Sequence, residues 1–140
     1  MPKILILCTG NSCRSQMAEG FLRSLDDSLK VFSAGTKPAG AVHLKAVQVM
    51  KESGIDISGH YPKNAAFFKN DDFDYVITVC GSAKETCPVF TGRVRHQIHI
   101  GFDDPAKALG PDDKIIREFR RVRDDIREKV LLLYKNNIKV

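Results

Sequence analysis

Short apolar runs and longer amphipathic segments alternate along the chain, and this pattern predicts alternating strands and helices. Short runs enriched in β-branched and other apolar residues predict buried strands. They lie at residues 4–7, 30–34, 73–79 and 97–100. Apolar residues spaced by three or four positions predict helices. They lie at residues 15–25, around residues 44–50, where Gly54 closes the helix, and at residues 115–133.

This order of elements predicts a single α/β domain over residues 1–140, a three-layer sandwich with a four-stranded parallel sheet and helices on both faces. Ligands of such sheets bind at the carboxyl ends of the strands. Cys8 and Cys80 each follow a predicted strand, so we expect both to face the same crevice. Phe67 and Phe68 lie in a segment without a clear pattern, and we expect them to pack into the core rather than line the site.

Composition narrows the class of function without deciding it. The chain of 140 residues carries a net charge of +5, and 43% of its residues are hydrophobic, as in ordinary globular proteins. A basic surface attracts phosphate, arsenate or nucleic acid, but Trp is absent and no basic stripe is interleaved with aromatics, which argues against nucleic acid. The run at residues 4–7 is too short for a signal peptide or a membrane span, so we expect a cytoplasmic protein. Four cysteines in a reducing compartment favour redox or metal chemistry.

The clearest chemical motif is the segment from Cys8 to Ser15, between the first predicted strand and the first predicted helix. A loop in this place directs backbone N–H groups into one concavity, which suits an oxyanion. The Cys8 thiol would face that concavity, and the N–H groups and the Arg14 guanidinium should lower its pKa. The guanidinium could also bind two oxyanion oxygens. The plain alternative is a structural cysteine at the end of a core strand, with Arg14 in solvent.

The motif Cys-x5-Arg-Ser near the start of a chain of this size resembles the low-molecular-weight tyrosine phosphatases, and the longer string CTGNSCRSQMAEG resembles the thioredoxin-coupled arsenate reductases built on the same fold. The resemblance implies that Cys8 is the nucleophile, that Ser15 hydrogen-bonds its sulfur and that Asn11 braces the loop. Cys13 is expected to be a packing or secondary redox residue that turnover does not require. The expected oxyanion-binding residues are Thr9, Gly10, Asn11, Ser12, Cys13 and Arg14.

A second pair of cysteines, Cys80 and Cys87, separates the two families. A phosphatase has no use for the pair, whereas a reductase can relay two electrons through thiols. The resemblance implies that Cys8 attacks arsenate and that Cys80 then attacks Cys8 and releases arsenite. Cys87 would then attack Cys80 and free Cys8, and thioredoxin would reduce the resulting Cys80–Cys87 disulfide. The residues alone leave two other interpretations open: incidental buried thiols, or a zinc site, for which the spacings are poor.

Asp104 precedes Pro105 in the loop after the last predicted strand and is the candidate general acid. The resemblance implies this role, because both families carry an Asp-Pro element there. From the residues alone, Asp104 could instead be a turn former, and its neighbour Asp103 stays a candidate acid. Ala106 follows, where the phosphatases commonly have a Tyr that grips an aryl ring, and this weakens the phosphatase interpretation.

Some reductases of this family bind potassium beside the loop, through residues that match Asn11, Glu19, Ser33 and an aspartate. In our alignment Lys63 stands at the aspartate position. We expect its ammonium group to pair with Glu19, and we predict no potassium requirement, no other metal and no cofactor. The four histidines show no metal-ligand spacing with an acidic partner and are expected to be structural or at the surface.

The sequence therefore favours a monomeric, cytoplasmic, thioredoxin-dependent arsenate reductase with a weak phosphatase side activity. The alternative enzyme is a low-molecular-weight tyrosine phosphatase that forms a phosphocysteine. A third interpretation is an oxyanion-binding or redox-sensing module without turnover. Neither nucleic acid nor a membrane is an expected partner.

Overall fold

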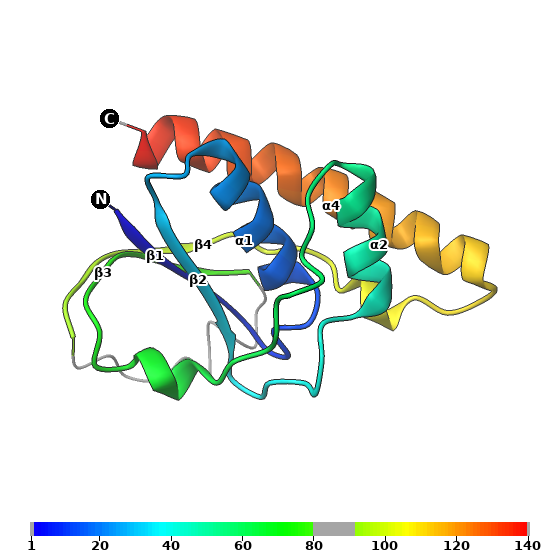
Figure 1. The fold of residues 1–140 in the computed structure, drawn as a ribbon, viewed down its shortest axis with the longest axis horizontal. Helices are drawn as coiled ribbons and strands as arrows, with labels where there is room; N and C mark the ends of the chain where they lie inside the picture. The colour runs from blue at the N-terminus through cyan, green and yellow to red at the C-terminus, as the bar shows by residue number, and fades with distance from the viewer. Residues whose placement is uncertain (1, 80–91, 140) are drawn as a thin grey trace.

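Four strands pair in the order β2-β1-β3-β4, and every pair is parallel (Figure 1). The computed structural model describes residues 2–79 and 92–139, so Cys80, Cys87 and the polar segment between them lie outside the described residues. The strands are β1 (Lys3–Cys8), β2 (Lys30–Gly35), β3 (Phe73–Thr78) and β4 (Val94–His99). The predicted α/β class and four-stranded parallel sheet are confirmed.

The inner strand β1 ends at the candidate nucleophile. Its residues Ile4 to Leu7 are each at most 1% exposed, because neighbouring strands pair on both sides and other elements cover both faces. A strand buried in this way appears in the sequence as a continuous apolar run. Cys8 lies beside Gly35 of β2, and Leu7 lies beside Thr78 of β3. The carboxyl ends of three strands therefore meet at one edge, as expected.

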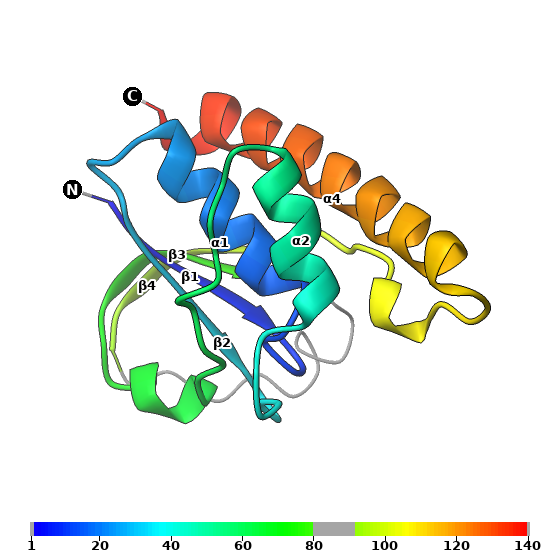
Figure 2. The same ribbon diagram turned by 45° about the vertical axis from the view of Figure 1, so that its right-hand side comes forward.

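The α-helices of the described chain are α1 (Arg14–Leu25), α2 (Leu44–Glu52) and α4 (Asp112–Leu133). Helices α1 and α4 lie side by side over the sheet in both views (Figures 1 and 2). Helix α2 packs on α4, where Glu52 accepts hydrogen bonds from Arg120 and Arg123. None of these helices combines the length and the apolar composition that a bilayer crossing requires. The buried stripe of α4 matches the predicted amphipathic pattern: Phe119, Val122, Ile126, Val130 and Leu133.

The segment between α2 and β3 contains a short 3-10 helix, η1 (Ala65–Phe68). Figure 1 shows this green segment across the sheet from α1 and α4, so it covers part of the other face. Phe68 packs as predicted, between Phe32 at 5.7 Å and Phe73 at 6.1 Å between ring centroids. The prediction for Phe67 was wrong, because its side chain is 81% exposed. Adjacent residues of a helical turn point in different directions, so only one of the two rings reaches the core.

The last strand begins at Val94, three residues before its predicted start. It is an edge strand that pairs only with β3 among the described strands. Arg95, His96 and Gln97 are exposed, so its first half lacks the apolar pattern of a buried strand. The pairing with β3, rather than hydrophobic burial, holds this half of the strand.

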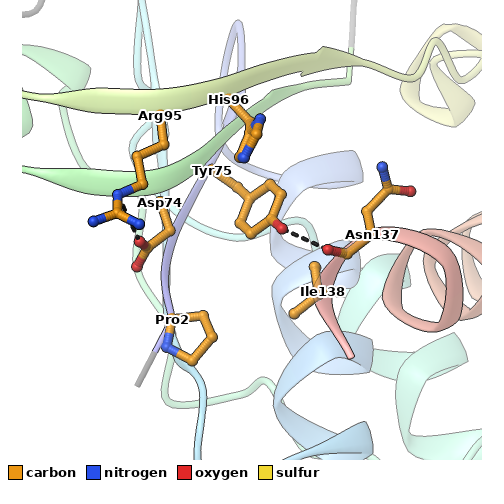
Figure 3. A pocket seen from close by; sticks show the side chains of 7 residues that line it. All are labelled: Pro2, Asp74, Tyr75, Arg95, His96, Asn137 and Ile138. Carbon is orange, nitrogen blue, oxygen red and sulfur yellow. Dashed lines mark hydrogen bonds and ion pairs between the residues drawn. The ribbon is translucent and has the colours of Figure 1, made fainter. Parts of the chain in front are cut away.

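The amino ends of the strands border a hollow of about 280 Å³, which Figure 3 shows from close by. The Tyr75 hydroxyl donates to the Asn137 carbonyl of the π-helical turn η3 (Tyr134–Ile138), and the Tyr75 ring stacks on His96 at 5.1 Å. These contacts attach the C-terminal turn to the sheet. The hollow lies at the opposite end of the strands from Cys8. Its lining residues are Pro2, Asp74, Tyr75, Arg95, His96, Asn137 and Ile138.

Candidate active site

Cys8 occupies the last position of β1, and its side chain is held by hydrogen bonds rather than by packing alone. Its sulfur lies 2.7 Å from the Ser15 hydroxyl and accepts a hydrogen bond of 3.1 Å from the backbone N–H of Asn11. Cys8 is 2% exposed and Ser15 is fully buried. Strand, loop and helix thus converge on one sulfur atom, which is the arrangement predicted for a nucleophile.

The carbonyls of the loop after Cys8 point outward. Four of them accept hydrogen bonds from backbone N–H groups of residues 36–43, over distances of 2.8–3.1 Å. The pairs are Thr36 with Cys8, Lys37 with Thr9, Ala39 with Gly10, and His43 with Ser12. These four carbonyls are engaged by residues 36–43, whereas the Asn11 N–H points to the Cys8 sulfur, so this side of the loop presents a hydrogen-bond donor. A concavity of this kind attracts an anion.

Gly35, at the end of β2, is required by the close approach of this loop. A Cβ atom at residue 35 would lie 2.5 Å from the Thr9 carbonyl oxygen and 3.1 Å from the backbone nitrogen of Asn11. Real side chains do not approach backbone atoms so closely, so any residue but glycine would displace the loop. The sequence placed Gly35 at a strand end but gave no local sign of this contact.

Asn11 is the one non-glycine residue of the described chain with a positive φ, at 52°. Asn tolerates this left-handed region better than most residues. Its side-chain amide donates to Ser15 at 2.7 Å and to Ser33 at 3.0 Å, and its side-chain oxygen accepts from the Lys63 N–H at 2.9 Å. The bracing role that the resemblance implied is thus visible as contacts to three separate segments.

Arg14 and Asp104 approach each other at the mouth of the loop. The Arg14 guanidinium lies 3.5 Å from the Asp104 carboxylate and donates to the Phe102 carbonyl at 3.3 Å. Asp104 also caps η2 (Pro105–Lys107) by accepting the Ala106 N–H at 3.0 Å, which is the turn-forming role that the residues alone suggested. Asp103 instead binds Arg121 of α4 at 3.0 Å, and 77% of its side chain is exposed. Asp104 is therefore the better placed acid.

The predicted lowering of the Cys8 pKa is not what this structure gives. Burial raises the pKa of the Cys8 thiol, and this outweighs the hydrogen bonds from Ser15 and Asn11 and the charge of Arg14, all of which lower it. Burial likewise raises the pKa of Cys13 to about 11. The loop motif identified the groups that stabilise a thiolate, but the depth of the sulfur could not be read from sequence.

The expectation that Lys63 pairs with Glu19 was wrong. The Lys63 ammonium donates to the Tyr61 carbonyl at 2.8 Å and lies over the Tyr61 ring. Among the described residues, Glu19 instead pairs with Arg23 at 3.1 Å and with His60 at 3.5 Å. The second oxygen of Glu19, Oε1, is buried without a hydrogen-bond partner in the described chain.

Three cationic or ionisable side chains, those of Arg23, His60 and Lys63, line the same hollow as Glu19. Potassium would have to compete with them for one free carboxylate oxygen, so the residues fit this ion poorly. Nor do three His, Cys, Asp or Glu side chains converge as metal ligands anywhere in the described residues. Within residues 2–79 and 92–139, His60 is the one histidine that lies within 4 Å of a carboxylate, a contact that its sequence position did not reveal.

The sequence and the fold of this chain are similar to those of known proteins. The low molecular weight phosphotyrosine protein phosphatase family matches residues 3–139. An arsenate reductase of Halalkalibacterium halodurans is 47% identical over 128 residues, which are 91% of each chain, and one of Bacillus subtilis is 46% identical over 124 residues, which are 88% of each. A solved structure of an arsenate reductase in the phosphate-binding state is 35% identical, covers 96% of this chain and 98% of its own, and superposes with a TM-score of 0.79.

Proposed function

Because this chain belongs to the low molecular weight phosphotyrosine protein phosphatase family, and its relatives include arsenate reductases that are 46% and 47% identical to it, we propose that it reduces arsenate to arsenite. The observation that carries the proposal is the Cys8 sulfur, held by Ser15 and Asn11 at the base of a loop in which four carbonyls are bonded to residues 36–43. The names of the relatives indicate arsenate as the oxyanion, and the loop provides the groups that would bind it.

In the first step the Cys8 thiolate attacks the arsenic atom of a bound arsenate. The inward N–H groups and the Arg14 guanidinium neutralise the oxyanion, as donors in such a cradle do. Asp104 gives its proton to the departing oxygen, which leaves as water, and a sulfur–arsenic(V) bond remains. Ser15 stabilises the thiolate before attack, because its hydroxyl is 2.7 Å from the sulfur.

In the second step Cys80 attacks the Cys8 sulfur. The electron pair of the sulfur–arsenic bond passes to arsenic, which leaves as arsenite, and a Cys8–Cys80 disulfide forms. Cys87 then attacks Cys80, which frees Cys8 and moves the disulfide to the other two cysteines, where thioredoxin reduces it. Cys80 and Cys87 lie outside the described residues, so this relay is supported by their positions in the sequence and by the family. We place the reaction in the cytoplasm, where thiols are kept reduced.

Weak hydrolysis of small phosphate esters belongs to the same proposal. It uses the same loop, nucleophile and acid, with phosphorus in place of arsenic and without the second pair of cysteines. The residue after Pro105 is Ala106, so we expect little grip on an aryl group.

The test is arsenate-dependent oxidation of NADPH in the presence of thioredoxin and thioredoxin reductase, run beside a phosphate-ester assay. The native chain should be active in the first assay and weak in the second. Cys8→Ser should abolish both activities while the protein keeps its melting temperature within a few degrees. Activity of Cys8→Ser above trace level would remove the one-nucleophile mechanism, and a native chain that is active on esters alone would make it a phosphatase.

A further inference from the structure

Gln16, in the first turn of α1, is a fully buried polar residue to which the mechanism above gives no role. Its side-chain nitrogen lies 3.1 Å from each of three oxygens: the Asn11 carbonyl, the Asn11 side-chain oxygen and the Tyr61 carbonyl. Its side-chain oxygen lies 3.0 Å from Nδ1 of His60. A buried amide that satisfies both of its ends in this way links the loop to the segment that follows α2.

The direction of every hydrogen bond around Gln16 is fixed by its partners. The three oxygens near the nitrogen are acceptors without a proton, so the end of the Gln16 amide that faces them must be its NH2 group, whose two protons they share. The Gln16 oxygen then faces His60, and Nδ1 of His60 must carry the proton. Burial lowers the pKa of His60, which agrees with a neutral ring, and the contact with the Gln16 oxygen sets its tautomer. No other orientation of the Gln16 amide satisfies its partners.

The same reasoning extends from Asn11 to the sulfur. The Asn11 side-chain oxygen accepts from Gln16 and from the Lys63 N–H, so its nitrogen must point to Ser15 and Ser33. The Ser15 oxygen accepts from Asn11, which leaves the Ser15 hydroxyl proton free for Cys8. The donors therefore run in one direction, from His60 through Gln16, Asn11 and Ser15 to the sulfur. Such chains polarise one another when they are buried.

Gln16 also acts on the backbone of Asn11, which holds the strained positive φ. Its amide donates to the carbonyl of that same residue, whose N–H donates to the Cys8 sulfur at 3.1 Å. Two of the donors to the sulfur, the Asn11 N–H and the Ser15 hydroxyl, thus depend on how Asn11 is oriented. Gln16 contacts Asn11 at both its main-chain and its side-chain oxygen.

We propose that Gln16 is a positioning residue for the nucleophile: it fixes the orientation of Asn11 and thereby favours the thiolate form of Cys8. The effect offsets part of the burial that disfavours the thiolate. The inference rests on the proposed role of Cys8 as nucleophile, but it concerns the ionisation of that thiol and not the later relay.

The experiment follows the ionisation of Cys8 directly. Alkylation of the full chain by iodoacetamide is measured from pH 6 to 10, and the label is located on Cys8 by fragmentation mass spectrometry. Gln16→Met keeps the length of the side chain but removes its donor and acceptor. We expect Cys8 alkylation at neutral pH to slow about three- to tenfold and its midpoint to move to higher pH, as for the loss of one or two hydrogen bonds to a charged group. The matched control is Gln48→Met, on the exposed side of α2, which should behave as the native chain.

Gln16→Glu provides a second variant with nearly the native volume. Its carboxylate can still accept from His60 but cannot donate to Asn11, so the midpoint should rise at least as far as in Gln16→Met. A melting temperature that falls in either variant without movement of the Cys8 midpoint, within roughly 0.2 pH units, would reduce Gln16 to a packing residue and overturn the inference. Alkylation needs no arsenate, so a native chain that fails to reduce arsenate would refute the proposed function and leave this measurement intact.

Discussion

The Arg14 guanidinium lies 3.5 Å from the Asp104 carboxylate, while the neighbouring Asp103 turns away to Arg121 on α4. One of two adjacent aspartates thus faces the oxyanion loop, and the other pairs with an arginine on the exposed side of α4. The sequence pair Asp-Asp-Pro left the choice of acid open, and the contacts of the two side chains favour Asp104.

We expect Asp104→Asn to lower the rate of arsenate reduction by about a hundred- to ten-thousand-fold, as for the loss of a general acid. Asn retains an oxygen that can accept the Ala106 N–H, so the η2 cap and the binding of phosphate should persist. Asp103→Asn is the matched control and should change the rate little. Steady-state kinetics with a phosphate titration separates these effects, and the reverse ranking of the two variants would assign the acid to Asp103.

The contact between Gly35 and Thr9 predicts a large effect of one methyl group. Gly35→Ala should destabilise the protein by about 1–3 kcal/mol, as for overpacking, and should weaken phosphate binding because the loop must move. Gly40→Ala is the control, since in the described part of the chain a Cβ at that position meets nothing within 4 Å beyond its own chain neighbours. Urea unfolding and phosphate titration of both variants make the comparison. Equal stabilities would show that the loop moves without cost.

The buried thiols predict a loss of stability at alkaline pH. Burial raises the pKa of Cys8, and it raises that of Cys13 to about 11, whereas a thiol of the unfolded chain titrates near 8.5. The folded state therefore holds these protons longer, so the stabilisation is complete below about pH 8.5 and is lost as the pH rises toward 11. Each thiol can contribute a slope of up to about 1.4 kcal/mol per pH unit. The free energy of unfolding can be measured with urea under reducing conditions at pH 8, 9 and 10. It should fall less steeply with pH in Cys13→Ala than in the native chain, and an equal fall in both would contradict the prediction.

The surroundings of Glu19 predict no preference for potassium. Arg23 and His60 already pair with this carboxylate, and the Lys63 ammonium occupies the Tyr61 carbonyl beside it. Activity and melting temperature should be equal in sodium chloride and potassium chloride at the same ionic strength. The unpartnered Glu19 Oε1 is the reason to make the measurement. A rise in stability that potassium alone produces would show that this oxygen recruits the ion.

The two cysteines of the proposed relay should fail at different stages. Cys80→Ser should stall with arsenic still attached to Cys8, because nothing then attacks that sulfur. Cys87→Ser should release one equivalent of arsenite and stop as a Cys8–Cys80 disulfide. Neither change should affect phosphate-ester hydrolysis. Single-turnover arsenite release with mass spectrometry of the trapped species checks this order, and repeated turnover of Cys87→Ser with thioredoxin as sole donor would exclude the three-cysteine scheme.

The sequence predicted those features that local pattern encodes. The run before Cys8, the amphipathic stripe of α4 and the loop motif each lie within one continuous segment, so their periodicity or spacing was sufficient. Asn11 and Gln16 could be read from the sequence, but their partners could not. Asn11 contacts Ser33 and Lys63, and Gln16 contacts Tyr61, over separations of 22 to 52 positions in the sequence. No local pattern reports such contacts.

The remaining differences have the same origin. The depth of the Cys8 sulfur depends on how the helices and the loop close over it, so the balance between burial and hydrogen bonding could not be judged from the motif. The start of β4 depends on pairing with β3 and not on its own exposed residues. Phe67 and Phe68 are chemically identical, and only the direction of the η1 turn separates them.

The outward-facing carbonyls of the loop also bear on the competition between substrates in a cell. Binding by amide N–H groups and one guanidinium depends on the shape and charge of the anion. Arsenate and phosphate are both tetrahedral dianions, so they share these two properties. We expect abundant phosphate to occupy the loop and to leave it unchanged, so the phosphate pool would set the fraction of enzyme that arsenate encounters. Selectivity would then arise after binding, because arsenic(V) accepts two electrons from a thiol pair and phosphorus(V) does not.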